Sequence, residues 1–298
     1  MKIANAPCSW GILEFGLDGT TDSYQKMLDE MSIAGYNGTE LGDWGFLPTE
    51  PNLLQKELEI RDLKLVGAFV PVNFRKQEDH HAGLENALKI ARLLGEVHSS
   101  EATIVLSDEN GKDPLRRHNA GRIQPEHQLS SDEWKIFSNG VEKVARTVLD
   151  ETGIPSVFHH HCAGFVESPD EIRILMERTD PELLGLCFDT GHYAYGGGNP
   201  VEGLSEHFSR IRHVHFKDFD PAIARKSKQN NWDYFESLEN GIFSELGKGS
   251  IDFEKVLKRL EKEKYDGWVV VEQDILPGMG SPLESAKRNR EYLRSIGL

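Results

Sequence analysis

The chain has 298 residues, which suffice for one large barrel or two ordinary domains, and its net charge is −15. Its 38% hydrophobic and 28% charged residues are typical of a soluble globular protein. The negative charge argues against a nucleic-acid partner, because such partners select a basic surface. A local basic patch stays open, since four basic side chains cluster in one segment: Arg116, Arg117, His118 and Arg122.

The sequence also disfavours membrane insertion and secretion. No apolar run approaches the ~20 residues that span a bilayer. The N-terminal segment MKIANAPCSWG lacks the apolar stretch of a signal peptide, so we expect a cytoplasmic protein with no membrane partner. Cys8, Cys162 and Cys187 show no CxxC spacing, which predicts small buried residues near strand ends and no disulfide framework.

Short apolar runs alternate with amphipathic stretches from one end of the chain to the other. Each run has the length and apolar character of a buried strand. The eight predicted strands are Ile3–Cys8, Gly38–Leu41, Leu65–Val70, Ala102–Leu106, Ser156–His161, Leu184–Phe188, Ile211–Phe216 and Trp268–Glu272.

Helical periodicity fills several of the intervals between these strands. The apolar residues Tyr24, Met27, Leu28 and Met31 lie on one helical face, and Gly35 is the expected C-cap. The same spacing occurs from Leu84 to Ala91 and from Phe253 to Leu260, and a last helix is predicted from Pro282 to Ile296. Two helix starts have clear capping signals: Ser130 with Glu133, and Ser168 followed by Pro169.

Eight strand–helix units in about 300 residues match a (β/α)₈ barrel, so we predict one TIM-barrel domain over residues 1–298. A doubly wound open sheet stays open, because periodicity does not reveal closure. No GxGxxG follows the first strand, which removes support for a dinucleotide-binding half. The long connections 107–129 and 217–250 both follow a strand, so they are expected to overhang the mouth of the barrel.

Polar residues end several of the predicted strands. They are Glu40, the triplet His159, His160 and His161, then Asp189 with His192, His215, and Glu272. At the C-terminal ends of barrel strands such side chains converge on one site. Imidazole and carboxylate together favour Mn²⁺, Co²⁺, Fe²⁺ or Zn²⁺, whereas an all-oxygen site would favour Mg²⁺ or Ca²⁺. Each residue taken alone has a structural explanation, but equivalent positions in four units predict a metal site.

Alternation along a strand limits the choice of ligands without completing it. His159 and His161 share one face of their strand, and His160 takes the other. His213 and His215 likewise face together. Spacing alone leaves open which member of each pair binds metal.

These motifs resemble the xylose isomerase-like TIM-barrel superfamily. The resemblance rests on APCSWG, GTELG, HHH, DTGH, HVHFKD and VVVEQD, and it covers nearly the whole chain. Within that group the chain is most similar to inosose (2-keto-myo-inositol) dehydratases, which also carry the triple histidine. The loop Asn240-Gly241-Ile242-Phe243, followed by Gly247-Lys248-Gly249, adds to this likeness.

The resemblance implies a ligand set. The metal aspartate of the superfamily falls on Asp189, the metal histidine on His215 and the last metal glutamate on Glu272. The fifth-strand ligand, a glutamate in epimerases, falls on His159. Mn²⁺ or Co²⁺ is the expected cofactor, with Zn²⁺, Fe²⁺ or Mg²⁺ as alternatives.

The resemblance also implies roles for other residues, which stay open in detail. Glu272, His192, His161 and Lys217 are the expected catalytic groups, with His192 also contacting substrate. We expect Glu40, Trp10 and His160 to bind substrate. Glu40 has the alternative role of orienting a histidine, and Trp10 that of closing the barrel rim.

Three functions follow as hypotheses. The first is a lyase that eliminates water from a keto-inositol or related keto-sugar, and the second is a keto-sugar isomerase or 3-epimerase. The third is a sugar-binding barrel without catalysis. DNA repair is disfavoured, because the strands reading LVGAFVPVN and ATIVLSD lack the additional zinc-binding histidines of endonuclease IV. Enzymes of the group are often homodimers or homotetramers, so a homo-oligomer acting on a small polyhydroxy carbonyl compound is expected.

Overall fold

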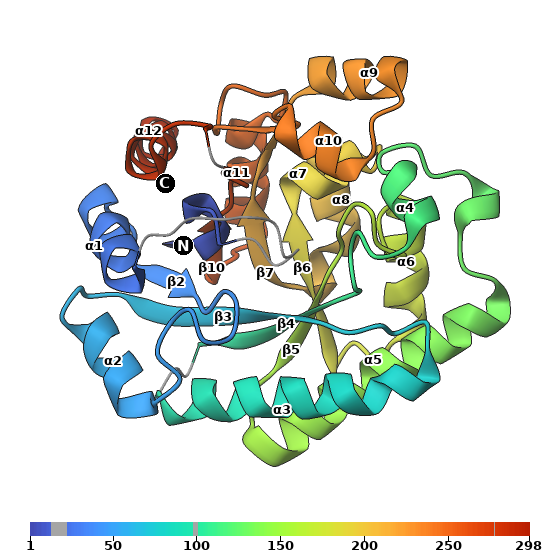
Figure 1. Ribbon diagram of the computed structural model, residues 1–298, viewed down its shortest axis with the longest axis horizontal. Helices are drawn as coiled ribbons and strands as arrows, with labels where there is room; N and C mark the ends of the chain where they lie inside the picture. The colour runs from blue at the N-terminus through green and yellow to red at the C-terminus, as the bar shows by residue number, and fades with distance from the viewer. Residues whose placement is uncertain (13–22, 98–100, 277) are drawn as a thin grey trace.

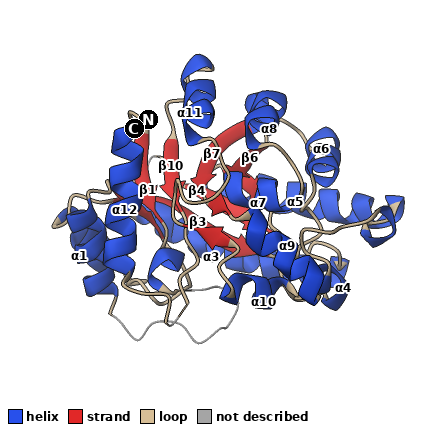
Figure 2. Cartoon of the chain, turned by 90° about the horizontal axis from the view of Figure 1, so that it is seen from above, coloured by secondary structure: helices blue, strands red, loops and turns tan. Residues whose placement is uncertain are grey.

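Eight parallel strands close into a barrel surrounded by helices in the computed structural model, which describes residues 1–12, 23–97, 101–276 and 278–298 (Figure 1). The strands follow the order β1–β10–β7–β6–β5–β4–β3–β2, so the first and last strands pair. Lys2 lies opposite Trp268 and Asn5 opposite Val271 at this junction. The two chain ends consequently lie close together (Figure 2). The predicted (β/α)₈ barrel is confirmed.

All eight predicted strands are present, but the first and the fifth end two or more residues earlier than predicted. The barrel strands are β1 (Lys2–Asn5), β2 (Gly38–Glu40), β3 (Lys64–Pro71), β4 (Thr103–Ser107), β5 (Ser156–His159), β6 (Leu184–Asp189), β7 (Ile211–Phe216) and β10 (Trp268–Val271). The first strand stops before Pro7, which has no N–H to pair and begins the 3₁₀ helix η1 (Pro7–Trp10). The fifth strand stops at His159, because the His161 N–H donates to the Val166 carbonyl in a turn.

Helices cover the outside of the barrel, and several lie in its connections. They are α1 (Tyr24–Ala34), α2 (Pro51–Glu59), α3 (His80–Glu96), α4 (Pro114–His118), α5 (Ser131–Thr152), α6 (Pro169–Arg178), α7 (Thr190–Tyr195), α8 (Pro200–His207), α9 (Pro221–Asn230), α10 (Tyr234–Glu239), α11 (Phe253–Lys262) and α12 (Pro282–Ser295). Three short 3₁₀ helices accompany them, namely η2 (Gln77–Asp79), η3 (Pro125–His127) and η4 (Phe208–Arg210). Among the described helices, none combines the length and apolar content required to cross a bilayer.

The predicted capping signals are found where the sequence places them. Ser130 accepts from the Glu133 N–H while the Glu133 carboxylate accepts from the Ser130 N–H, which starts α5. Ser168 caps α6 in the same way. Gly35 ends α1 with φ 90°, a left-handed conformation that glycine adopts without a steric penalty.

The two long connections fold against each other. The connection 107–129 contains α4, whose Arg116 is fully buried and pairs with Glu171 at 2.8 Å. Arg117 lies 3.1 Å from Asp233, and Arg122 donates to the Trp232 carbonyl at 2.9 Å, both in the connection 217–250. The three arginines are thus engaged within the protein, and the basic patch that the sequence left open is not formed by them.

A single carboxylate organises the second long connection. This connection contains a two-stranded sheet of β8 (Asp218–Phe219) and β9 (Phe243–Ser244). Asp218 accepts hydrogen bonds from the backbone N–H groups of Phe219, Gly247, Gly249 and Ile251. A Cβ atom at Gly249 would lie 2.3 Å from Asp218 Oδ1 and 2.5 Å from the Phe219 carbonyl. The second glycine of the Gly247-Lys248-Gly249 motif is therefore required by close packing.

Candidate metal and active site

The four predicted metal ligands converge at the C-terminal end of the barrel. His159, Asp189 and His215 stand at or near the ends of β5, β6 and β7, and Glu272 directly follows β10. One donor atom from each residue lies within 4.8 Å of the others. Asp189 Oδ2 is 3.7 Å from His159 Nε2 and 3.9 Å from His215 Nδ1. His215 Nδ1 is also 3.1 Å from Glu272 Oε1.

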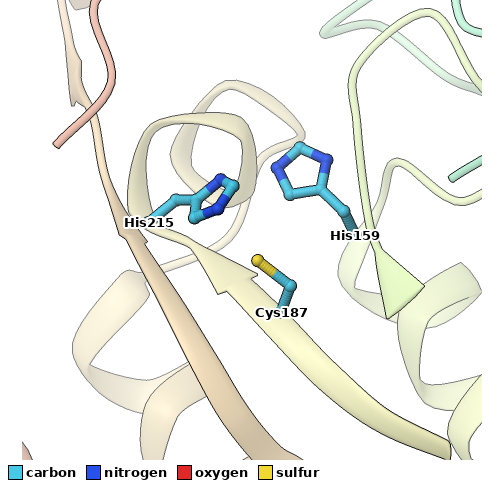
Figure 3. A group of neighbouring side chains, drawn as sticks. All are labelled: His159, Cys187 and His215. Carbon is cyan, nitrogen blue, oxygen red and sulfur yellow. The ribbon is translucent and has the colours of Figure 1, made fainter. Parts of the chain in front are cut away.

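The backbone explains this convergence. β6 lies between β5 and β7, and Asp189 pairs with His215 in the strand register. Asp189 also caps α7, since its Oδ1 accepts from the His192 N–H at 2.7 Å. Its second oxygen, Oδ2, is therefore left to face the two histidines. Figure 3 shows the rings of His159 and His215 turned toward each other above the thiol of Cys187.

The converging donor atoms have no conventional partners. Among the described residues, the following buried atoms make no hydrogen bond: His159 Nδ1, His159 Nε2, Asp189 Oδ2 and His215 Nδ1. An unpaired buried polar group typically costs ~1–3 kcal/mol, so lone pairs of the two histidines that face the Asp189 and Glu272 carboxylates favour a bound cation between them. Two imidazoles and two carboxylates match the ligand preferences of divalent first-row metals. The residues present therefore fit a divalent metal.

Glu40 fixes the orientation of His215. Its Oε1 accepts from His213 Nε2 at 2.8 Å and from His215 Nε2 at 2.9 Å. Because a carboxylate only accepts, both Nε2 atoms carry protons, which leaves Nδ1 as the His215 atom that faces the other predicted metal ligands. Burial would raise the pKa of Glu40, but His215 and His213 outweigh burial and lower it to about 2. Gly67 leaves room for this carboxylate, since a Cβ there would lie 3.2 Å from Oε1.

A pocket opens beside the ligands, and Lys217 is the one cation among the described residues that line it. Lys217 Nζ lies 3.1 Å from Glu272 Oε2, 3.1 Å from Asp274 Oδ2 and 3.3 Å from His192 Nε2. Burial alone would lower the pKa of Lys217, but the carboxylates of Asp274, Glu272 and Asp189 hold it well above its usual value. The pocket thus contains a protonated lysine next to the predicted metal ligands.

Two neutral histidines lie next to Lys217. Burial, together with His159 and Lys217, holds the pKa of His161 well below its usual range. Burial, together with His161 and Lys217, also holds the pKa of His192 well below its usual range. Their ring centres are 3.8 Å apart. His161 Nδ1 contacts the Cys162 carbonyl, which only accepts, so Nδ1 carries the proton and Nε2 the lone pair. His161 also lines the pocket and is therefore placed to act as a base.

Trp10 and His160 lie outside the pocket. The Trp10 indole is buried at 1% exposure and donates to Glu30 at 2.8 Å. His160 faces away from the barrel axis, packs edge-on against Phe188 and Tyr193, and accepts from the Asp189 N–H at 3.2 Å. The structure therefore does not support the predicted substrate contacts of these two residues. His192 is likewise not among the described residues that line the pocket, and it lies against His161 and Lys217 instead.

Sequence reasoning missed two residues of the site. Asp274 lines the pocket and holds Lys217, and the EQD motif carried a signal for it, since Asp274 follows Glu272 by two residues. Cys187 was predicted only as a small buried residue, yet its thiol belongs to a group of possible metal donors with His159 and His215. Its position two residues before Asp189 on the same strand was the available signal.

Comparisons with known proteins agree with the barrel fold. The family model described as Xylose isomerase-like TIM barrel matches residues 28–296. An inosose dehydratase of Clostridium botulinum (strain Alaska E43 / Type E3) is 31% identical over 294 residues, which cover 99% of this chain and 96% of the relative.

Solved structures show the same fold at low sequence identity. The probable 3-DHS dehydratase AsbF from Bacillus anthracis has a TM-score of 0.74 at 14% identity and covers 99% of both chains. The IOLI protein, whose structure holds a zinc atom, has a TM-score of 0.73 at 14% identity and covers 99% of this chain and 98% of that one. From the family match and the full-length similarity together, the chain belongs to the xylose isomerase-like TIM barrel family.

Proposed function

We propose that the chain is a metal-dependent dehydratase that eliminates water from a keto-inositol or a related keto-sugar. The observation that carries the proposal is the cluster of unpaired buried donor atoms beside the buried cation of Lys217. The 31% identity to an inosose dehydratase over 99% of the chain supports the choice of substrate class.

His159, Asp189, His215 and Glu272 would hold the metal. The bound ion would polarise the substrate carbonyl, which makes the neighbouring C–H bond more acidic. We propose Mn²⁺ or Co²⁺, with Zn²⁺, Fe²⁺ and Mg²⁺ as alternatives, because a mixed nitrogen and oxygen donor set accepts several of these ions.

The chain supplies the base and the acid of the elimination. His161 Nε2 removes the proton from the carbon next to the ketone, and the C–H electron pair forms the new C=C bond. Lys217 donates a proton to the hydroxyl on the following carbon, which leaves as water. Asp274 and Glu272 hold the Lys217 ammonium in place at 3.1 Å each, and all three residues line the pocket.

The same base and cation would also support proton exchange without loss of water, the reaction of an isomerase or epimerase. One experiment separates the two reactions. The protein is stripped with a chelator, reloaded with Mn²⁺ or Co²⁺ and mixed with 2-keto-myo-inositol in D₂O. Ultraviolet absorbance of the conjugated dione reports elimination, and NMR reports deuterium at the α-carbon.

We expect metal-dependent growth of the dione signal in the wild type and none in Asp189→Ala. If a panel of keto-sugars takes up deuterium without losing water, the chain is an isomerase or epimerase and the dehydratase proposal is wrong. Metal-loaded protein that does neither would refute both reactions and leave a binding protein.

We further propose a cytoplasmic location, a single domain over residues 1–298 and a homodimer or homotetramer without a nucleic-acid partner. Light scattering on the purified protein measures the oligomeric state directly, and a mass equal to the 33.6 kDa chain would refute the last proposal.

A further inference from the structure

A thiol lies directly below the predicted metal ligands inside the barrel. Cys187 is fully buried on β6, two residues before Asp189, so both side chains point to the barrel axis. In the strand register Cys187 lies opposite His159 on β5 and opposite His213 on β7. The β6–β7 register shifts between Leu186 and Cys187.

The thiol completes a second donor set. One donor atom each of His159, Cys187 and His215 lies within 4.8 Å of the others, and Figure 3 shows the sulfur directed between the two imidazole rings. His159 is 3% exposed, and among the described residues neither of its ring nitrogens has a hydrogen-bond partner. The group therefore contains an unpaired, buried nitrogen donor in addition to the cysteine.

We propose that His159, Cys187 and His215 form a second metal position, specific for thiophilic divalent cations such as Zn²⁺ and Cd²⁺. The two positions share both histidines, so one ion occupies either the upper, oxygen-containing position with Asp189 and Glu272 or the lower, sulfur-containing one. The proposal thus rests on the metal site of the proposed function.

The chemistry of the two donor sets separates the ions. Thiolate is a soft ligand that selects Zn²⁺ and similar metals, whereas carboxylate suits Mn²⁺. Binding at the lower position replaces the Cys187 S–H proton by the metal, and the proton is released to the solvent. An ion held there would lie on the Cys187 side of the two histidines, deeper in the barrel than Asp189.

Cd²⁺ added to the stripped, full-length protein tests the proposal, because a metal–thiolate bond absorbs in the ultraviolet by charge transfer. We expect this absorption in the wild type and its absence in Cys187→Ser and Cys187→Ala. Cys8→Ser is the control, because Cys8 lines the pocket, and it should keep the absorption. Outer-shell contacts alone change metal affinity by ~10–100-fold, so loss of a direct ligand should lower Cd²⁺ affinity by about 100-fold or more. Mn²⁺ affinity should stay close to that of the wild type, which also shows that the variants are folded.

The outcomes distinguish this proposal from the proposed function. If the wild type binds Cd²⁺ or Mn²⁺ but Cd²⁺ gives no charge-transfer absorption, the lower position alone is overturned. A wild type that binds none of these ions would overturn both. The chain has three cysteines, so a Cys8→Ser, Cys162→Ser double variant leaves Cys187 as the only thiol. Loss of the absorption in that double variant would also overturn the assignment, and its persistence would support it even if the Cys187 variants failed to fold.

Discussion

Removal of the Glu40 carboxylate should weaken metal binding although Glu40 is outside the four-residue ligand set. Glu40 Oε1 is the shared acceptor for His213 Nε2 and His215 Nε2, at 2.8 and 2.9 Å. In Glu40→Ala both N–H groups lose this acceptor, and the His215 ring is free to take the tautomer whose Nδ1 carries a proton. A protonated Nδ1 cannot bind a metal.

The size of the effect follows from what each substitution removes. Glu40→Gln keeps a carbonyl oxygen that accepts both N–H groups and loses only the negative charge. Loss of a hydrogen-bond partner of a metal ligand typically lowers metal affinity by ~10–100-fold, equivalent to ~1.4–2.7 kcal/mol. We therefore expect Glu40→Gln near the lower end of this range and Glu40→Ala near the upper end.

Mn²⁺ titration in competition with a chelator measures these affinities. Glu30→Gln is a matched control, because Glu30 also accepts a hydrogen bond from a ring N–H, that of Trp10 at 2.8 Å, away from the metal ligands. If folded Glu40→Ala binds Mn²⁺ within about twofold of the wild type, Glu40 does not orient His215 for the metal, because loss of such a hydrogen-bond partner typically lowers metal affinity at least ~10-fold.

Three further predictions concern the lysine, the buried ion pair and pH. Asp274→Asn removes one of the carboxylates that hold Lys217, so kcat should fall by about 100-fold while the Mn²⁺ affinity stays unchanged. Turnover and Mn²⁺ titration of the same preparation measure the two quantities, and a kcat equal to that of the wild type would refute the positioning role of Asp274. Glu171→Gln leaves the buried Arg116 without its counter-ion, which should lower the free energy of unfolding by ~3–5 kcal/mol in urea, and a change under ~1 kcal/mol would contradict this. Burial raises the pKa of Glu167 to about 7, above the value of about 4.3 in the unfolded chain. The folded state therefore holds this proton more tightly, and the stability that it contributes is complete below about pH 4.3 and is lost as the pH rises through 7. The urea midpoint of the wild type relative to Glu167→Gln should fall across that window, and a constant difference would count against the buried carboxyl.

The convergence of the four candidate metal ligands could be predicted from the sequence because their signal is local. His159, Asp189, His215 and Glu272 each follow a recognisable apolar run, and parallel strands in a barrel bring such positions to one end. Alternation also placed His159 and His160 on opposite faces, as the structure has them. Periodicity of two along a strand is thus sufficient to select the residues that face the axis.

The contacts between distant side chains could not be predicted in this way. Glu40 and His215 are 175 positions apart in the chain, and their hydrogen bond depends on barrel diameter and strand stagger, which no local pattern encodes. The burial of Trp10 against Glu30 depends in the same way on how η1 packs against α1. The end of β5 at His159 was missed because the turn to Val166 is fixed by residues beyond the histidine triplet.

The position of Glu272 next to the junction of the first and last strands links the metal to the lifetime of the folded state. Glu272 follows β10, which pairs with β1 on one side and with β7, the strand of His215, on the other. The donor set is therefore complete only after the barrel has closed, and an open chain lacks the site. A metal concentration of 100 times the dissociation constant would stabilise the closed barrel by ~2.7 kcal/mol. Because the ion binds only after the barrel has closed, this stabilisation would slow unfolding and leave the folding rate unchanged. Metal supply would then determine how long each molecule survives before it unfolds.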